Sequence, residues 1–280
     1  MEPSQRLAEA ERIARLAGER IVAARESQAF QQRYKSGDEL VTDADVEIDR
    51  IIASELDAHF RDDARLTEEI SPDRDVLEDN DAVWIVDPID GTVNFAYGHP
   101  HVAVSIAWAS EGKLRLGVVH APFLGETFTA LRGEGAWLNG EPIQTSNASE
   151  LSRSLVATGF PYRRDARAPL FRRLAGVLTS CRDIRRNGSA ALDLCHVACG
   201  RLDAYYESVS PWDFAAGLLI AREAGAKTGH LYQCPDRIPS ELYGENILVG
   251  SPGIYGALRD ILLKADEGRL DEIEAQMDLP

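Results

Sequence analysis

The chain has 280 residues, of which 44% are hydrophobic and 27% charged, the composition of an ordinary globular protein. Its formal net charge of −16 at pH 7 argues against nonspecific binding to nucleic acid or to anionic membranes. No apolar run approaches the ~20 residues of a membrane-spanning helix, and the polar start Met1–Arg6 lacks a signal-peptide pattern. We therefore expect a cytoplasmic protein with no nucleic-acid partner and no membrane partner.

The first half of the chain predicts two amphipathic helices followed by strands. Apolar residues recur at helical spacing over residues 4–27, with Glu and Arg between them. Thr42 or Asp43 can cap a second helix, which we expect to run to about Phe60. Strand patterns then alternate with glycine turns, which is typical of a meander rather than a βαβ series. The predicted strands are Val83–Val86, Val102–Ala109, Leu114–His120, Glu126–Leu131 and Ala136–Leu138.

The second half mixes helices with short strands and ends in an acidic tail, residues 266–280, predicted to be a frayed helix or disordered. This order of elements predicts an α+β protein of alternating helical and sheet layers. We expect a single domain, 1–280, with half-domains of about 1–150 and about 151–265. The predicted elements are helices at 166–178, Ser189–Cys199, Trp212–Ala224 and Pro252–Leu263, and strands at Leu202–Glu207 and Asn246–Gly250.

One stretch, Trp84–Phe95, is the most informative of the chain. An apolar run ends in Asp87 and Asp90, and Gly91 and Thr92 follow at once. Carboxylates alone would repel a phosphate, whereas carboxylates that hold Mg²⁺ beside backbone N–H donors would bind one. The stretch therefore predicts metal-assisted chemistry on a phosphate ester.

Other acidic residues extend this candidate site. Glu68–Glu69 precede the strand, Asp45 opens the second helix, and Asp213 begins a later helix. Scattered acids are usually solvated, but Asp87, Asp90 and Asp213 each adjoin apolar or aromatic residues, where an unpaired charge would be costly. A buried cluster of like charges needs a cation. Because the cluster contains no His or Cys, its hard oxygen ligands favour Mg²⁺ over zinc.

Two long segments resemble the signatures of the inositol monophosphatase family, the Mg²⁺-dependent, lithium-sensitive phosphomonoesterases. They are Trp84–Tyr97 (WIVDPIDGTVNFAY) and Trp212–Ala226 (WDFAAGLLIAREAGA), with Glu68–Glu69 upstream. The resemblance covers the chain from about Leu7 to about Leu263. It implies a layered αβαβα sandwich of the inositol monophosphatase and fructose-1,6-bisphosphatase type, and a homodimer.

The resemblance also implies a role for individual residues in catalysis and metal binding. Thr92 and Asp45 match the pair that orients the attacking water, and we expect Glu68 to be a catalytic residue as well. The residues that match the two metal sites are Glu68, Asp87 and the backbone carbonyl of Ile89 for the first, and Asp87, Asp90 and Asp213 for the second.

Further matched positions face the substrate. The N–H groups of Gly91 and Thr92 match those that hold the phosphate. Lys35 and Glu39 match positions near the loop over the site. The residues that match contacts to polyol hydroxyls are Asp90, Ser189, Ala190 and Glu207.

These observations predict a Mg²⁺-dependent phosphomonoesterase that hydrolyses myo-inositol monophosphate to inositol and phosphate. Direct in-line attack by a metal-activated water is expected, because no Cys, Ser or His is placed as a covalent nucleophile. Two alternatives use the same site, a fructose-1,6-bisphosphatase or a 3′-phosphoadenosine 5′-phosphate phosphatase. An alternative of another class is an acidic interaction or regulatory protein with secondary catalysis, suggested by the net charge and the acidic tail. The set of converging acids argues against it.

Overall fold

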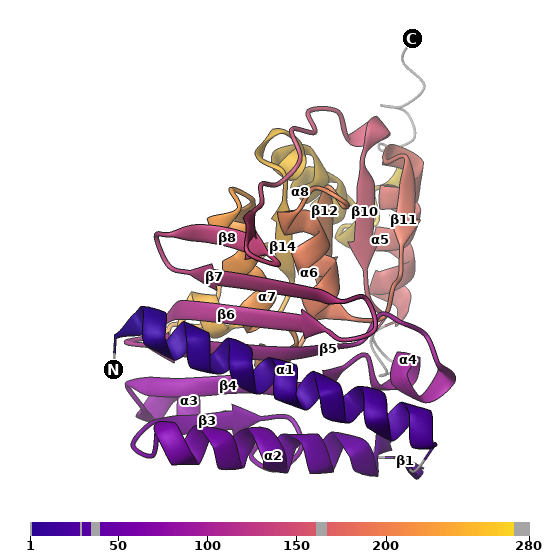
Figure 1. Ribbon diagram of the computed structural model, residues 1–280. Coiled ribbons are helices and arrows are strands. Elements are labelled where there is room, and N and C mark those ends of the chain that lie inside the picture. The colour runs from indigo at the N-terminus through magenta and orange to yellow at the C-terminus, as the bar shows by residue number, and fades with distance from the viewer. Residues whose placement is uncertain (1, 29, 35–39, 161–166, 272–280) are drawn as a thin grey trace.

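The computed structural model describes residues 2–28, 30–34, 40–160 and 167–271 (Figure 1). Lys35, Glu39 and residues 272–280 of the acidic tail lie outside this part of the chain. Within it, none of the helices combines the length and apolar character needed to cross a bilayer. The helices are α1 (Pro3–Ser27), α2 (Asp43–His59), α3 (Val76–Asp79), α4 (Thr92–Tyr97), α5 (Arg167–Ser180), α6 (Ala190–Ala198), α7 (Pro211–Glu223) and α8 (Pro252–Asp266), with 3₁₀ turns η1 (Leu151–Arg153) and η3 (Ser240–Leu242).

A seven-stranded sheet forms the first half of the fold. Its strands are β3 (Ala64–Thr67), β4 (Ala82–Asp90), β5 (Ala103–Ser110), β6 (Lys113–Ala121), β7 (Glu126–Leu131), β8 (Gly135–Leu138) and β9 (Glu141–Pro142). They lie in that order, and β4 to β9 pair antiparallel, as the predicted meander requires. The added edge strand β3 is parallel to β4. The prediction that the β4 strand ends at Val86 was wrong, because the strand continues through Asp90.

A five-stranded sheet, in the order β11-β10-β12-β14-β13, forms the second half. Sequence patterns predicted β12 and β14, but missed the other three strands, which are only three or four residues long. Length does not distinguish them from β12 and β14, which have four residues each, but β11 and β13, with the sequences DIR and KTGH, lack an apolar run. The strands are β10 (Leu155–Thr158), β11 (Asp183–Arg185), β12 (Ala204–Glu207), β13 (Lys227–His230) and β14 (Ile247–Gly250), while β1 (Gln32–Tyr34) and β2 (Leu40–Thr42) form a separate hairpin.

The two sheets and three pairs of helices stack in alternating layers, which confirms the predicted α+β sandwich (Figure 1). α1 and α2 cover the outer face of the large sheet, α6 and α7 fill the space between the sheets, and α5 and α8 cover the small sheet. The middle layer is tightly packed: a Cβ on Gly117 of β6 would lie 2.7 Å from the carbonyl oxygen of Ala216 in α7. We propose that the boundary between the two half-domains lies near residue 150.

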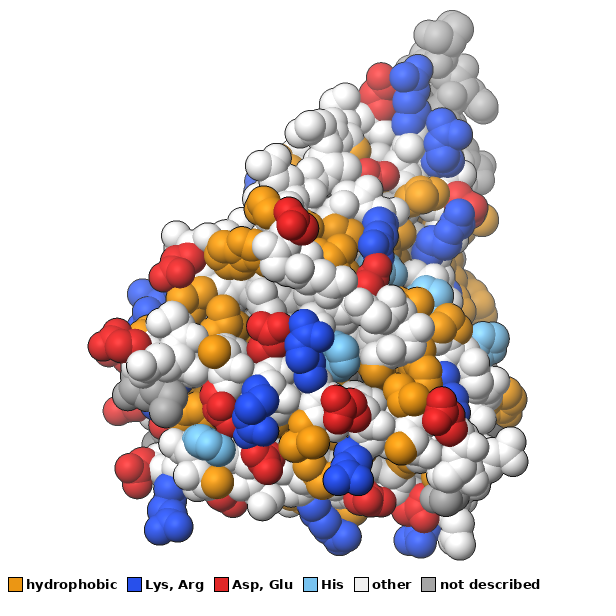
Figure 2. All heavy atoms as spheres, viewed as in Figure 1, with side chains coloured by type: hydrophobic (Ala, Val, Ile, Leu, Met, Phe, Trp, Pro, Cys, Tyr) orange, Lys and Arg blue, Asp and Glu red, His pale blue; other side chains and the backbone are white. Residues whose placement is uncertain are grey.

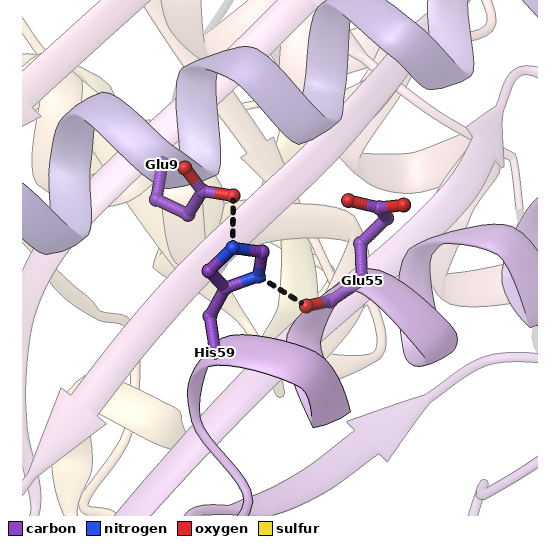
Figure 3. Close-up of side chains that lie close together, drawn as sticks. All are labelled: Glu9, Glu55 and His59. Carbon is purple, nitrogen blue, oxygen red and sulfur yellow. Dashed lines mark hydrogen bonds and ion pairs between the residues drawn. The ribbon is translucent and has the colours of Figure 1, made fainter.

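Side chains on the solvent side tie α1 to α2 (Figure 3). The His59 Nε2 lies 3.4 Å from Oε1 of Glu9, and its Nδ1 lies 2.9 Å from the carbonyl oxygen of Glu55. Arg12 of α1 donates to the carboxylates of both glutamates. The N-cap of α2 is Thr42, one of the two predicted cap residues, and its C-cap is Phe60.

Candidate active site

The end of β4 places two carboxylates on one side of the sheet. Asp87 lies opposite Ser105 of β5 and Asp90 lies opposite Ala103, so three steps along β4 match two along β5. Side chains three positions apart on a regular strand point to opposite faces, and the extra residue of a β-bulge corrects this. Pro88 fits the irregular position because it has no N–H to offer the ladder. The bulge thus brings Asp87 and Asp90 together.

A third carboxylate reaches the same point from the start of α7. Asp87, Asp90 and Asp213 each offer an oxygen atom, and these atoms lie within 4.8 Å of one another. Asp213 is held by the backbone N–H of Ser210, which it accepts at 2.7 Å in the capping box of α7. Asp87 accepts the N–H of Ile89 at 3.0 Å. The backbone therefore fixes these carboxylates before any ligand arrives.

The first turn of α6 anchors Asp90. Its Oδ2 accepts the backbone N–H of Ala191 at 2.8 Å and the hydroxyl of Ser189. Ser189 is also the N-cap of α6, since its Oγ accepts the N–H of Leu192 at 3.3 Å. The hydroxyl predicted to face a polyol is therefore donated to Asp90 in this structure. This bond joins the large sheet to the helical layer between the sheets.

Burial and mutual repulsion dominate the electrostatics of the cluster. Burial raises the pKa of Asp87 and of Asp213 well above the ordinary value, and the charge of Glu68 raises both further. Burial raises the pKa of Asp90 to about 6, although the hydrogen bond from Ser189 opposes the shift. Like charges in so small a space need protons or a cation. An all-oxygen donor set of this kind fits a hard divalent cation.

A hydroxyl lies beside the cluster at the start of α4. Thr92 Oγ1 lies 2.9 Å from Oδ1 of Asp45 and 3.2 Å from the carbonyl oxygen of Ile89. Asp45 is completely buried, and its Oδ2 accepts the N–H of Thr42 at 2.8 Å. Gly91 precedes the helix with φ of 93°, and a Cβ there would lie 2.7 Å from the carbonyl oxygen of His101. Only glycine fits this entry to the helix.

These groups line a cavity of about 450 Å³. Asp45 lies behind Thr92, one hydrogen bond from the cavity. Glu207 also lines the cavity and accepts the hydroxyl of Tyr205, and burial raises its pKa to about 7. The predicted site residues that line the cavity are Glu68, Asp87, Ile89, Asp90, Gly91, Thr92, Ser189, Ala190, Glu207 and Asp213.

Sequence reasoning gave no role to several residues of this cavity. Asp193 lines the cavity, and burial raises the pKa of this carboxyl group to about 8. Asp193 accepts a hydrogen bond from Nδ2 of Asn187 at 2.7 Å. An acid within the apolar run of α6 was the available signal. Arg74 lines the cavity as well and donates to Ser210 Oγ at 2.7 Å.

Asn94, within the first signature, joins two loops by hydrogen bonds. Its Nδ2 donates to the carbonyl oxygens of His101 and Asn187, at 2.8 Å each. These bonds link the loop after α4 to the loop before α6.

A layered α+β fold whose acidic side chains meet at the end of a strand, beside the start of a helix, defines a protein of the metal-dependent phosphatase class. The family model "Inositol monophosphatase family" matches residues 2–265. The chain belongs to the inositol monophosphatase family.

Named relatives agree with this assignment. The Nus factor SuhB of Vibrio cholerae is 39% identical over 256 residues, which cover 89% of this chain and 93% of the relative. The structure of an inositol monophosphatase from Anabaena is 33% identical, with a TM-score of 0.80 over 93% of this chain and 96% of that one. SaIMPase-II with inositol monophosphate bound is 26% identical, with a TM-score of 0.77 over 96% of this chain and 97% of that one, and it was also solved with 2′AMP.

Proposed function

We propose that this protein is a Mg²⁺-dependent phosphomonoesterase that hydrolyses inositol monophosphate to inositol and phosphate. The observation that carries the proposal is the convergence of Asp87, Asp90 and Asp213 within 4.8 Å, at one wall of a cavity that also holds Thr92. Asp87 and Asp90 are buried, Asp213 is partly buried, and the pKa values of all three are raised. The repulsion among three such carboxylates destabilises the fold unless protons or a cation join them.

Oxygen donors alone surround the proposed cations. We assign Glu68, Asp87 and the carbonyl of Ile89 to one cation, and Asp87, Asp90 and Asp213 to the other. Carboxylates, a carbonyl and water suit Mg²⁺ better than zinc. When bound, such cations neutralise the phosphate and make water acidic enough to attack phosphorus at neutral pH.

Thr92 and Asp45 position the attacking water in this proposal. Asp45 is buried and accepts the Thr92 hydroxyl, which leaves the lone pairs of Thr92 Oγ1 directed away from Asp45. A water that donates to this oxygen is oriented by the Thr92–Asp45 pair. The N–H groups of Gly91 and Thr92, in the first turn of α4, lack partners within the helix and hold the phosphoryl oxygens.

The alcohol part of the substrate lies between Asp90 and Glu207. Ser189 and Ala190 line the same cavity, and Ser189 acts through Asp90. The inositol monophosphate bound to SaIMPase-II supports a polyol in this space. The 2′AMP bound to the same relative supports a nucleotide as the alternative occupant, and fructose-1,6-bisphosphate remains a third candidate.

Phosphate release from a small panel of esters tests this proposal. The panel contains inositol 1-phosphate, fructose 1,6-bisphosphate, 3′-phosphoadenosine 5′-phosphate and 2′AMP, each with Mg²⁺ and with EDTA. We expect Mg²⁺-dependent release that is fastest from inositol 1-phosphate, and inhibition by Li⁺. Faster release from another ester would keep the metal chemistry and replace the substrate. No release from any ester by the folded protein would reject the enzyme.

The names of the relatives favour a second candidate function. Proteins 37–39% identical to this chain are called Nus factor SuhB, which suggests a partner in transcription. Acidic and basic side chains are interspersed over the face that carries α1 and α2, with no basic patch on it (Figure 2). With a net charge of −16, we therefore propose that such a partner is a protein rather than bare RNA.

Capture of components of the transcription apparatus, by the full chain and by a chain ending at residue 265, tests this second function. Asp213→Asn is the matched variant, because it would remove catalysis and leave the surface unchanged. Capture by Asp213→Asn would show that binding is independent of the phosphatase site. The predicted homodimer is tested in the same preparation by light scattering after gel filtration.

A further inference from the structure

α2 presents two fully buried carboxylates on one face. Asp45 and Asp49 both have 0% exposure and lie four residues apart, one above the other on the helix. The proposed function uses Asp45, which accepts the hydroxyl of Thr92, but it gives no part to Asp49. A buried carboxylate needs strong hydrogen-bond donors to remain in the interior.

Backbone N–H groups of a single tight loop supply donors to Asp49. Its Oδ2 accepts the N–H of Glu69 and the N–H of Ile70, each at 3.0 Å. Two further hydrogen bonds close the same loop. The N–H of Thr67 donates to the carbonyl oxygen of Ser71 at 3.0 Å, and the N–H of Ser71 donates to Oγ1 of Thr67 at 3.1 Å. Successive N–H groups that converge on one oxygen form an anion-binding nest, and here the anion is the side chain of Asp49.

Glu68 stands inside this loop. Its own N–H donates to the carbonyl of Val86 at 3.3 Å, and Val86 precedes Asp87 in β4. The backbone of Glu68 is therefore held by β4 on one side and, through the next peptide, by Asp49 on the other. The Glu68 side chain lines the catalytic cavity, and its charge raises the pKa of Asp87.

We propose that Asp49 is a positioning residue of the metal centre, which holds the peptide after Glu68 so that the Glu68 carboxylate faces Asp87. The inference rests on the proposed function. One rigid helix then sets two parts of the site from adjacent turns, Thr92 through Asp45 and Glu68 through Asp49. A helix fixes such a spacing better than two loops do, because four residues advance it by ~6 Å.

Calorimetric titration of Mg²⁺ into the metal-free protein, without substrate, tests the proposal at 25 °C. The variants are Asp49→Ala, which removes the acceptor, and Asp49→Asn, whose amide oxygen still accepts an N–H. Loss of a group that orients a metal ligand weakens metal affinity by about 10–100-fold. We expect a loss of this order for Asp49→Ala and a smaller loss for Asp49→Asn.

Asp203→Asn is the matched control. Asp203 also holds loop backbone, because it accepts the N–H of Leu155 at 2.7 Å and the hydroxyl of Ser146, but it lies at the opposite end of β12 from Glu207. The variant Asp203→Asn is expected to lower the melting temperature without changing the affinity for Mg²⁺.

The possible outcomes separate this inference from the proposed function. Wild-type Mg²⁺ affinity in either folded Asp49 variant overturns the inference alone, and so does an equal loss in Asp203→Asn. An unmodified protein that binds no Mg²⁺ overturns the inference and the proposed function together. If Asp49→Ala does not fold, weakened affinity in Asp49→Asn still supports the inference, and wild-type affinity in it overturns the inference.

Discussion

Two clusters in the described part of the chain bring three potential metal ligands within reach of one another, and they differ in every other respect. Asp87, Asp90 and Asp213 meet in the candidate active-site cavity, whereas Glu9, Glu55 and His59 meet on the solvent side of α1 and α2 (Figure 3). Burial and neighbouring acids raise the pKa values of the first cluster. In the second, the hydrogen bond from Arg12 lowers the pKa of Glu9.

This difference separates the proposed cation site from the acidic cluster on the surface. In the outer cluster, which consists of Glu9, Glu55 and His59, Arg12 donates to both glutamates and so supplies the positive charge. In the inner cluster, which consists of Asp87, Asp90 and Asp213, backbone N–H groups hold the carboxylates. These groups carry no net charge, so the repulsion among the carboxylates remains. Ligand spacing alone does not make a metal site, and unbalanced buried charge is the informative feature.

The largest effect that would sharpen this contrast is expected from Asp213→Asn. Loss of one ligand should lower kcat/KM by about 10³-fold, or ~4 kcal/mol of transition-state stabilisation. Because the variant also removes a charge from a repulsive cluster, the metal-free protein should melt at the same temperature or higher. Steady-state kinetics and melting curves without metal measure both effects. Normal kcat/KM would contradict the assignment of Asp213 as a ligand.

A smaller loss is expected from Thr92→Ala, which removes the hydroxyl that we propose orients the attacking water. A misplaced nucleophile costs about 10²-fold in kcat, while Mg²⁺ affinity should stay close to that of the wild type. Thr92→Ser keeps the hydroxyl on Asp45 and is the matched control. Equal kcat in the Ala and Ser variants would exclude this role for Thr92.

A rise in pH should have opposite effects on two properties of the inner cluster. It should lower the stability of the metal-free protein and raise the affinity for Mg²⁺. The pKa of Asp90 is raised from 3.8 to about 6, so the folded metal-free protein keeps a proton that the unfolded chain has lost. The stabilisation from that proton is complete below pH 3.8 and is lost as pH rises through about 6.

Mg²⁺ requires the carboxylate, so its affinity should fall about tenfold per pH unit below 6. Mg²⁺ titrations from pH 5 to pH 8 measure this dependence. Affinity that does not change over this range would contradict a protonated cluster.

The smallest effects are expected at the outer cluster. His59→Ala and Glu55→Gln should each change the free energy of unfolding by no more than about 0.5 kcal/mol, because exposed ion pairs contribute little. Neither variant should alter the Mg²⁺ dependence of catalysis. A weakened response to Mg²⁺ in His59→Ala would break the distinction between the two clusters.

Some features of the fold were predictable because their signals are local. The bounds of α1 and α2 follow from apolar spacing and from the cap Thr42, and the meander follows from alternation with glycine turns. The short strands β10, β11 and β13 were missed, because each depends on its neighbours in the small sheet rather than on its own pattern.

The sequence by itself determined the family and the candidate acids, since both signatures are contiguous and acids within apolar runs are conspicuous. Only the tertiary structure decided how these acids meet. A bulge in β4 turns Asp87 and Asp90 to one side, α7 brings Asp213 from more than a hundred residues away, and α2 reaches the Glu68 loop through Asp49. These relations depend on register and on packing between layers, which no single stretch of sequence encodes.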